Sequence, residues 1–215
     1  MSAIPSKEEM YNELIKRHGK ERQEKFDKSC VAVCGLGGLG SNIALSLARV
    51  GIGTLILIDF DRVDISNLHR QQYFANQIGL YKTDALKDIL TAVSPYIKIV
   101  THTVKINKDN IHELLSDADV ICEAFDKAEE KAMLINEVSE QFPDKYIVSG
   151  SGMAGFGEAN DIKTRRLTKR IFICGDGTSD ISHGTGLVSS RVMLCASHEA
   201  HAVLRILSEE QEIHQ

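Results

Sequence analysis

The sequence predicts an α/β fold in which a mostly parallel sheet is flanked by helices and extended by antiparallel strands toward the C-terminus. Short apolar, β-branched runs alternate with amphipathic helical patterns over residues 29–150, and strands that alternate with helices pair in parallel. The first of these runs leads directly into a glycine-rich turn. The chain has 215 residues, 43% of them hydrophobic, and no Pro/Gly/Ser-rich linker. We therefore expect one domain over residues 1–215.

Each element is expected from its local pattern. A charged segment with sparse apolar points predicts helix over residues 8–28, within an N-terminal helical part at residues 1–28. The elements expected next are strand 29–34, helix 39–50, strand 54–58, helix 82–92, strand 97–104, short helix 110–115, strand 119–124, helix 128–142 and strand 146–150. We expect this last strand to be the last parallel one. Within the later part, residues 151–215, a charged β-prone stretch at 161–174 predicts antiparallel strands, and residues 187–207 predict a closing helix.

A glycine-rich turn follows the first strand. Gly35, Gly37 and Gly40 stand in G-x-G-x-x-G spacing after the apolar run 31–34, with Gly38 between them. Strand, glycine turn and helix is the context in which backbone amides at a helix N-terminus receive a phosphate. Glycines in such a turn also serve packing alone, so the turn by itself leaves both interpretations open.

Polar residues beyond the second strand favour a nucleotide. Asp59 ends that strand, where a carboxylate can accept hydrogen bonds from ribose hydroxyls. Asn67 and Arg70 follow one helical turn apart, and Lys82 opens an amphipathic helix, where an ammonium near the positive helix end requires an anion. Arg and Lys together suit a triphosphate whose charge rises during transfer, whereas a dinucleotide pyrophosphate is held largely by backbone amides. The sequence therefore predicts ATP rather than NAD.

Four motifs together resemble one family. They are Gly35-Leu-Gly-Gly-Leu-Gly40, Asp59-x-Asp61-x-Val63, Ser66-Asn67-Leu68-x-Arg70-Gln71 and Gly79-x-x-Lys82. The resemblance is to the adenylation domain of the ubiquitin-activating-enzyme superfamily, in particular to its short bacterial ThiF and MoeB branch. It implies a Rossmann-like adenylation fold and a homodimer. It also implies that Mg²⁺ and ATP are used to adenylate the C-terminal glycine carboxylate of a small ubiquitin-like sulfur-carrier protein, giving an acyl-adenylate and pyrophosphate.

The resemblance further implies roles for individual residues. Arg70 and Lys82 would stabilise the transferring phosphate, and Asp126 would support Mg²⁺. The residues expected to bind ATP are Gly35, Gly37, Gly38, Gly40, Asp59, Asp61, Ser66, Asn67, Arg70 and Lys82. From position alone, Asp126 is an equally good N-cap for the following helix. Asp61 and Asp64 have loop capping as their alternative role, which we expect for Asp64.

The cysteines depart from those of better-known relatives. Many relatives carry two C-x-x-C pairs for structural zinc, and none of the five cysteines here forms such a pair, so we expect no structural zinc. Cys174 lies near the place of one such pair and is a candidate for sulfur relay. A strand-end cysteine is more often a small buried hydrophobe. Residues 179–186, where relatives often hold the relay cysteine, contain none.

A second departure concerns an arginine that relatives contribute across their dimer from the N-terminal segment. Glu13 occupies the matching position in this chain. Either Arg17 or Arg22 substitutes for that arginine, or the contact across the dimer is absent.

Composition argues against several other classes. The net charge of −5 disfavours a general nucleic-acid binder. No apolar run approaches the ~20 residues needed to span a bilayer, and the N-terminus lacks the pattern of a secretory signal. Cysteines lie mostly within apolar runs, which is typical of reduced thiols. We expect a soluble, cytoplasmic protein with no membrane partner.

The sequence does not name the carrier. A compact chain without zinc pairs resembles the ThiF type, so the ThiS-type carrier of thiamin biosynthesis is the first expectation. The alternatives within the superfamily are the molybdopterin carrier and the carboxylate acted on by tRNA threonylcarbamoyladenosine dehydratase. An NAD-dependent oxidoreductase and a catalytically silent binding partner are disfavoured by Arg70, Lys82 and Asp126 together. The basic run 163–170 is typical of a solvated edge, and an acidic carrier is the alternative partner for it.

Overall fold

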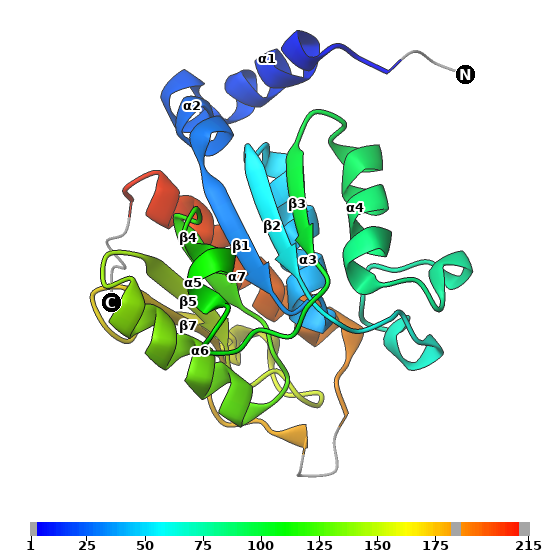
Figure 1. The fold of residues 1–215 in the computed structure, drawn as a ribbon, viewed down its shortest axis with the longest axis vertical. Helices are drawn as coiled ribbons and strands as arrows, with labels where there is room; N and C mark the ends of the chain where they lie inside the picture. The colour runs from blue at the N-terminus through cyan, green and yellow to red at the C-terminus, as the bar shows by residue number, and fades with distance from the viewer. Residues whose placement is uncertain (1–3, 182–185, 211–215) are drawn as a thin grey trace.

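A seven-stranded sheet forms the centre of the molecule, with helices on both faces (Figure 1). The computed structural model describes residues 4–181 and 186–210. The strands are β1 (Cys30–Cys34), β2 (Thr54–Ile58), β3 (Lys98–His102), β4 (Val120–Glu123), β5 (Tyr146–Gly150), β6 (Lys163–Arg166) and β7 (Ile171–Gly175). The α-helices are α1 (Lys7–His18), α2 (Lys20–Lys28), α3 (Gly38–Val50), α4 (Lys82–Val93), α5 (Ile111–Leu115), α6 (Ala128–Gln141) and α7 (Ser189–Leu207). Short 3₁₀ turns within the described ranges are η1 (Ile65–Asn67), η2 (Ala75–Gln77) and η3 (Ala159–Asp161).

The strand order confirms the predicted α/β fold and corrects one part of it. The order is β3-β2-β1-β4-β5-β7-β6, and among the described strands only the β6–β7 pair is antiparallel. The expectation that residues 146–150 form the last parallel strand is wrong, because β7 runs parallel to β5 with Ile147 opposite Ile171. After β5 the chain first builds the outer strand β6 and then turns back, which inserts β7 between them. The apolar sequence of β7 fits this interior place.

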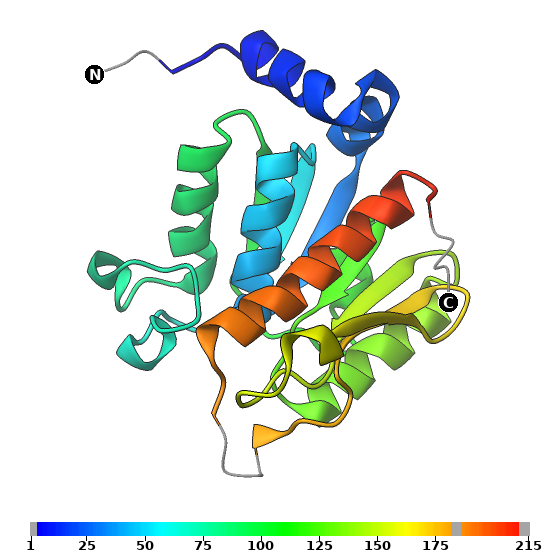
Figure 2. The ribbon, with the colours of Figure 1, turned by 180° about the vertical axis from the view of Figure 1, so that it is seen from behind.

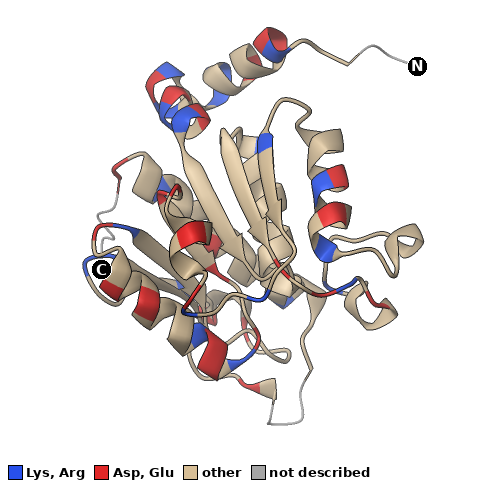
Figure 3. Cartoon of the chain, viewed as in Figure 1, with Lys and Arg blue, Asp and Glu red and all other residues tan. Residues whose placement is uncertain are grey.

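Alternate strand residues divide the core into two layers. Val31 and Val33 of β1 pack with the apolar faces of α3, α4 and α7, whereas Ala32 and Cys34 face α5 and α6. Figure 2 shows α7 lying diagonally across the first face beside α3. Figure 3 shows charged residues on the helices and loops rather than on the central strands. Burial on both faces explains why β1, β2 and β4 read as continuous apolar runs.

The N-terminal segment forms two helices rather than the single helical stretch expected. A capping box at Ser6 and Glu9 begins α1. Gly19 ends it, with φ at +82° and its N–H donating to the Ile15 carbonyl at 2.9 Å. A positive φ suits glycine because it has no Cβ, so the break falls at this residue.

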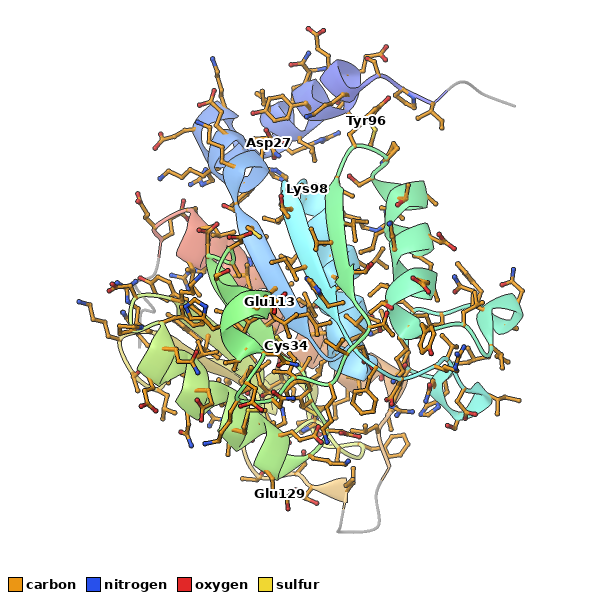
Figure 4. All side chains as sticks on the ribbon, in the orientation of Figure 1. Asp27, Cys34, Tyr96, Lys98, Glu113 and Glu129 are labelled. Atoms are coloured by element: carbon orange, nitrogen blue, oxygen red, sulfur yellow. The ribbon has the colours of Figure 1, made fainter. Side chains whose placement is uncertain are left out.

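The two ends of the sheet differ in what they carry. The labelled residues Asp27, Tyr96 and Lys98 lie at the amino-terminal end of the parallel strands, as do α1 and α2 (Figure 4). Cys34 and Glu129 mark the other direction, toward the carboxyl ends of the strands (Figure 4). In open α/β sheets, ligands bind at the carboxyl ends of the strands.

Candidate functional site

A cleft of about 590 Å³ opens where β1, β2, β4 and β5 end. It contains most of the residues that the sequence singled out. The predicted residues that line it are Gly35, Gly37, Gly38, Asp59, Asp61, Asn67, Arg70, Lys82 and Asp126. Gly40 and Ser66 are not among the lining residues. Residues separated by up to 91 positions are thus brought to one cavity.

Two positions of the turn require glycine for different structural reasons. Gly35 has φ at +91°, and a Cβ on it would lie 2.8 Å from the Ala124 carbonyl oxygen. A Cβ on Gly40 would lie only 1.8 Å from the Gly35 carbonyl oxygen. Gly40 therefore lets α3 pack against the turn, while the turn itself presents backbone at the N-terminus of α3, a favourable place for a phosphate.

Asp59 braces the glycine turn. Its Oδ2 accepts a hydrogen bond from the Leu36 N–H at 2.6 Å, and its Oδ1 accepts one from the Asp61 N–H at 2.8 Å. The Tyr73 hydroxyl donates to the Leu36 carbonyl at 2.8 Å. If Asp59 binds a ribose as expected, it does so with a carboxylate whose two oxygens already accept the hydrogen bonds that fix the turn.

Lys82 has an anion within the chain itself. It is only 6% exposed, and its Nζ lies 2.8 Å from Asp61 Oδ2 and 3.9 Å from Asp59 Oδ2. The anion that the sequence analysis requires for this lysine is therefore present within the chain, because these two carboxylates provide its charge balance. They also fix the lysine at the cleft, which it lines together with the glycine turn.

Arg70 keeps part of its guanidinium unsatisfied. Its Nη1 donates to the Ser66 carbonyl at 3.0 Å, while its buried Nε has no hydrogen-bond partner in the described chain. A buried donor without a partner is costly, so this one is well suited to a ligand oxygen. Gln71, which the sequence motif included without a role, also lines the cleft, and its buried Oε1 has no hydrogen-bond partner among the described residues.

The residues around Arg70 are held by a local capping box. Asp64 Oδ1 accepts from the Ser66 N–H at 2.9 Å, and Asn67 Oδ1 accepts from the Asp64 N–H at 3.0 Å. The capping role expected for Asp64 is confirmed. These contacts hold η1 and leave Ser66 outside the cleft lining.

Asp126 presents a carboxylate at the cleft. It lines the cleft and makes no hydrogen bond or ion pair with any described residue. Its alternative as a helix N-cap is wrong, because Lys127 is the N-cap residue of α6 and no side chain caps that end. A free carboxylate beside a phosphate-sized space suits a hard cation such as Mg²⁺.

A buried ion pair that the sequence analysis missed supports the Asp126 loop. Glu123 is fully buried at the end of β4, and Lys131 Nζ lies 2.9 Å from its Oε2. Glu123 also accepts from the Phe125 N–H at 2.7 Å and the Ser149 hydroxyl at 2.5 Å. Lys131 Nζ also donates a hydrogen bond to the Gly150 carbonyl at 3.1 Å. A charged residue within the apolar run of β4 was the available signal, since buried charges are paired.

The environment of Cys174 favours a structural role over sulfur relay. Its side chain is fully buried, and burial, with the nearby Glu199 carboxyl, raises the pKa of its thiol to about 12. Reactive cysteines have a lowered pKa and access to solvent. The loop in which relatives often hold the relay cysteine corresponds to residues 179–186. Part of it, residues 182–185, lies outside the described residues.

The N-terminal arginines lie far from the cleft of their own chain. Arg22 of α2 pairs with Glu210 at 2.6 Å, and α1 and α2 lie beyond the amino-terminal ends of the strands (Figure 1). Glu13 pairs with Lys16 on α1. A contribution of Arg17 or Arg22 to a cleft would therefore have to be made to that of a second copy of the chain.

Two further features concern the described residues as a whole. Over residues 4–181 and 186–210, no three or more His, Cys, Asp or Glu side chains are grouped so as to hold a metal ion. Within the same ranges, no helix combines the length and apolar character needed to cross a bilayer. The absence of structural zinc stays a prediction.

Sequence comparison connects this chain to known proteins. The model of the ThiF family matches residues 11–215. The protein "Adenylyltransferase and sulfurtransferase UBA4" of Scheffersomyces stipitis is 37% identical over 137 residues, and "Adenylyltransferase and sulfurtransferase MOCS3" of Aedes aegypti is 34% identical over 141. These matches cover 63% and 65% of this chain but 30% and 32% of the relatives. The chain thus spans about a third of the length of these curated relatives.

Structural comparison shows the fold over a longer range. The E. coli tRNA N6-threonylcarbamoyladenosine dehydratase TcdA, solved in complex with ATP, is similar with a TM-score of 0.86. The match covers 97% of this chain and 98% of that one, at 19% sequence identity. At this identity the likeness establishes the fold alone.

Proposed function

Because the chain belongs to the ThiF family, we propose that it is an ATP-dependent adenylyltransferase that activates a carboxylate. The observation that carries the proposal is the meeting of Arg70, Lys82 and Asp126 in one cleft beside the glycine turn. Two cations, backbone amides and a free carboxylate suit a triphosphate bound with Mg²⁺ better than a dinucleotide. The names of the UBA4 and MOCS3 relatives, both adenylyltransferases, support the same activity.

The proposed chemistry explains why the cleft needs no general base. A carboxylate is already an anion at neutral pH. One of its oxygens attacks the α-phosphorus of ATP, the bond from that phosphorus to the oxygen bridging to the β-phosphate breaks, and pyrophosphate leaves with the electron pair. The remaining difficulty is to bring two anions together and stabilise the charge on the transferring phosphate.

Individual residues of the cleft fit this task. Arg70 has a buried Nε free to donate to a phosphate oxygen, and Lys82 offers a point charge held in place by Asp61. The backbone of the turn from Gly35 to Gly38 receives another phosphate at the N-terminus of α3. Asp126 would hold Mg²⁺ together with phosphate oxygens, and Mg²⁺ would neutralise part of their charge.

We propose a small ubiquitin-like carrier protein with a Gly-Gly C-terminus as the source of the carboxylate. A ThiS-type carrier of thiamin biosynthesis is the first candidate and the molybdopterin carrier the second. In this proposal residues 29–150 bind ATP, residues 151–215 contact the carrier, and the protein acts as a homodimer. Adenylation requires none of the buried cysteines, so sulfur relay through Cys174 is not part of the proposal.

ATP–pyrophosphate exchange tests this function directly. Purified protein, Mg²⁺ and ATP would be combined with each of several Gly-Gly-ended carriers, and each carrier would also be tested without its last glycine. Exchange with one intact carrier, and none with its truncated form, is the expected result. ATP binding without exchange on any carrier would contradict carrier adenylation.

The second candidate is activation of a carboxylate on tRNA. It is motivated by the match in fold over nearly the whole length of both chains with the tRNA N6-threonylcarbamoyladenosine dehydratase. The basic residues of β6 and the turn after it offer a surface for an anionic partner. ATP consumption stimulated by tRNA carrying threonylcarbamoyladenosine, and not by any carrier, would replace the first candidate with this one.

A further inference from the structure

We infer that the buried ion pair between Arg191 and Asp176 is a positioning device for the carboxylate-bearing substrate. It acts through the side of the cleft opposite the ATP motifs, here called the distal wall: residues 150–154 together with residues 179–181, all of which line the cavity. The inference rests on the proposed adenylation function. Neither Arg191 nor Asp176 lines the cleft itself, so both act through the loops that they hold.

Arg191 joins α7 to the loop that follows β5. It is 6% exposed in the first turn of α7, and its Nη1 donates to the carbonyls of Gly157 at 2.5 Å and Glu158 at 2.9 Å. Its Nη2 is paired with Asp176 Oδ2. A planar guanidinium with donors in several directions can make all three contacts at once, which an ammonium cannot do with the same geometry.

Asp176 extends this connection to the second loop. Its Oδ1 accepts from the N–H groups of Thr178 and Ser179, both at 2.8 Å. Hydrogen bonding and the Arg191 guanidinium hold the pKa of the Asp176 carboxyl well below its usual range, although burial acts in the opposite direction. The Ser179 hydroxyl in turn accepts from the Ala154 N–H at 3.0 Å. One ion pair therefore ties both segments of the distal wall to α7.

The backbone of these loops needs such an anchor. Gly152, Gly155 and Gly177 have φ at +82°, +72° and +73°. Glycine adopts these angles freely but loses more conformational freedom than any other residue when it is fixed. The Asp176 N–H donates to the Gly152 carbonyl at 2.9 Å, and the Gly177 N–H donates to that of Ser151 at 3.0 Å. Without the ion pair, we expect both loops to open locally while the sheet stays folded.

The geometry separates this device from ATP binding. Lys82 is held by Asp61, and Asp59 fixes the turn at Leu36, and neither of these contacts involves Arg191 or Asp176. A substrate whose carboxylate must reach the α-phosphate meets the other side of the cleft. Loosening that side should therefore weaken use of the carboxylate substrate and leave ATP affinity unchanged.

Amide hydrogen exchange on the protein alone tests the structural half of the inference. In Arg191→Met, the amides of Ala154, Asp176, Gly177 and Ser179 should exchange at least about tenfold faster. Arg191→Lys should restore part of the protection because it keeps the charge. Arg166→Met is the matched control, since Arg166 is exposed and, among the described residues, its guanidinium donates to the carbonyls of Thr168 and Lys169 and lies over the Phe172 ring. Unchanged protection in both Arg191 variants would overturn the inference.

Kinetics and ATP titration test the functional half. With a ThiS-type carrier in pyrophosphate exchange, Arg191→Met should raise the KM for the carrier by about fivefold or more, leave the KM and Kd for ATP within about twofold, and change kcat little. Arg191→Lys should recover part of the carrier KM. An equal loss of ATP affinity, or a fall in kcat alone, would contradict a positioning role.

The two arms separate failure of this inference from failure of the proposed function. If no carrier supports exchange with the unsubstituted protein, carrier adenylation is wrong. The same variants are then assayed with tRNA bearing threonylcarbamoyladenosine, for which the same rise in KM is expected. If exchange is normal but Arg191→Met leaves the carrier KM unchanged, the positioning role alone is wrong.

Discussion

The two sides of the cleft are built in different ways. On the nucleotide side, Asp59 binds the Leu36 and Asp61 amides and Lys82 binds Asp61, so the contacts lie within one continuous stretch of the chain. On the distal wall, Arg191 and Asp176 join two separate loops to a helix that begins after both of them. A site assembled within one stretch leaves a motif in the sequence, whereas one assembled from distant segments does not.

The largest effect should come from the cations of the nucleotide side. Arg70→Ala or Lys82→Ala should lower turnover in pyrophosphate exchange by more than tenfold, because each removes charge that stabilises the transferring phosphate. Loss of a single charge-stabilising group typically lowers kcat by about 10²- to 10³-fold. Carrier affinity, which depends on the distal wall, should change little. Lys87→Ala, an exposed lysine on α4, is the control. Near-normal turnover in both variants would contradict the roles assigned to Arg70 and Lys82, and with them the comparison between the two sides of the cleft.

The next effect concerns Mg²⁺. Asp126→Ala should raise the Mg²⁺ concentration needed for half-maximal exchange by about tenfold or more, as expected when a group that supports a metal is lost. Binding of Mn²⁺ in the presence of ATP, followed by electron paramagnetic resonance, gives a readout independent of turnover. Glu129→Gln, an exposed carboxylate nearby on α6, should leave both unchanged. An unaltered Mg²⁺ requirement in Asp126→Ala would place the metal elsewhere.

A third prediction separates backbone strain from steric contact on the nucleotide side. Gly35 and Gly79 have nearly the same φ, +91° and +90°, but only Gly35 has a neighbour at the place of a Cβ, the Ala124 carbonyl at 2.8 Å. Gly79→Ala should lower the free energy of unfolding by about 1 kcal/mol through strain alone, and Gly35→Ala should lower it by up to about 3 kcal/mol. Urea titrations of both variants measure the difference. Equal losses would mean that the close contact relaxes at no cost.

The difference between the two sides of the cleft also shows how far the sequence could predict the structure. The order of strands and α-helices from residue 29 to residue 150 followed from apolar periodicity, and the glycine turn, Asp59 and Lys82 followed from short motifs. The place of β7 did not, because strand length and apolar character do not say which neighbour a strand will pair with. Arg191 and Asp176 gave no local signal at all, because each is buried only by pairing with the other, and the two residues are 15 positions apart in the chain.

Two residues did carry a signal that could have been used. Glu123 interrupts an apolar strand, and a carboxylate in such a place must find a partner, which Lys131 provides. Glu199 falls on the apolar face of the closing helix and is fully buried. In both cases the sequence indicates that a carboxyl group within an apolar pattern has to be accommodated, while only the structure shows how.

The accommodation of Glu199 gives a pH-dependent prediction. Burial raises the pKa of its carboxyl to about 8, even though Lys131 of α6 acts to lower it. Glu123 and the thiol of Cys195 also face it. Its Oε2 has no hydrogen-bond partner among the described residues.

The folded state therefore keeps a proton that the unfolded state releases near the ordinary pKa of about 4.5. Between these two values, the free energy of unfolding falls as pH rises, at no more than about 1.4 kcal/mol per pH unit. Glu199→Gln should remove this part of the slope, so that the variant gains stability relative to the parent from pH 6 to pH 8 by about 1–2 kcal/mol. Urea midpoints at both values measure it, with the exposed Glu113→Gln as the control. Parallel pH profiles for parent and Glu199→Gln would mean that this carboxyl is ionised in the folded state.

The smallest expected effect lies on the outer strand beyond the distal wall. Lys163 and Lys169 are exposed, at β6 and in the turn that follows it. Reversing both charges should change the free energy of unfolding by no more than about 0.5 kcal/mol, because exposed charges contribute little. If β6 attracts an acidic carrier, the double Lys→Glu variant should slow association severalfold and flatten its dependence on salt, while dissociation stays the same. Stopped-flow association at two ionic strengths measures this. Unchanged rates would confine recognition of the carrier to the cleft and its distal wall, because a surface that neither speeds encounter nor responds to salt contributes no electrostatic attraction.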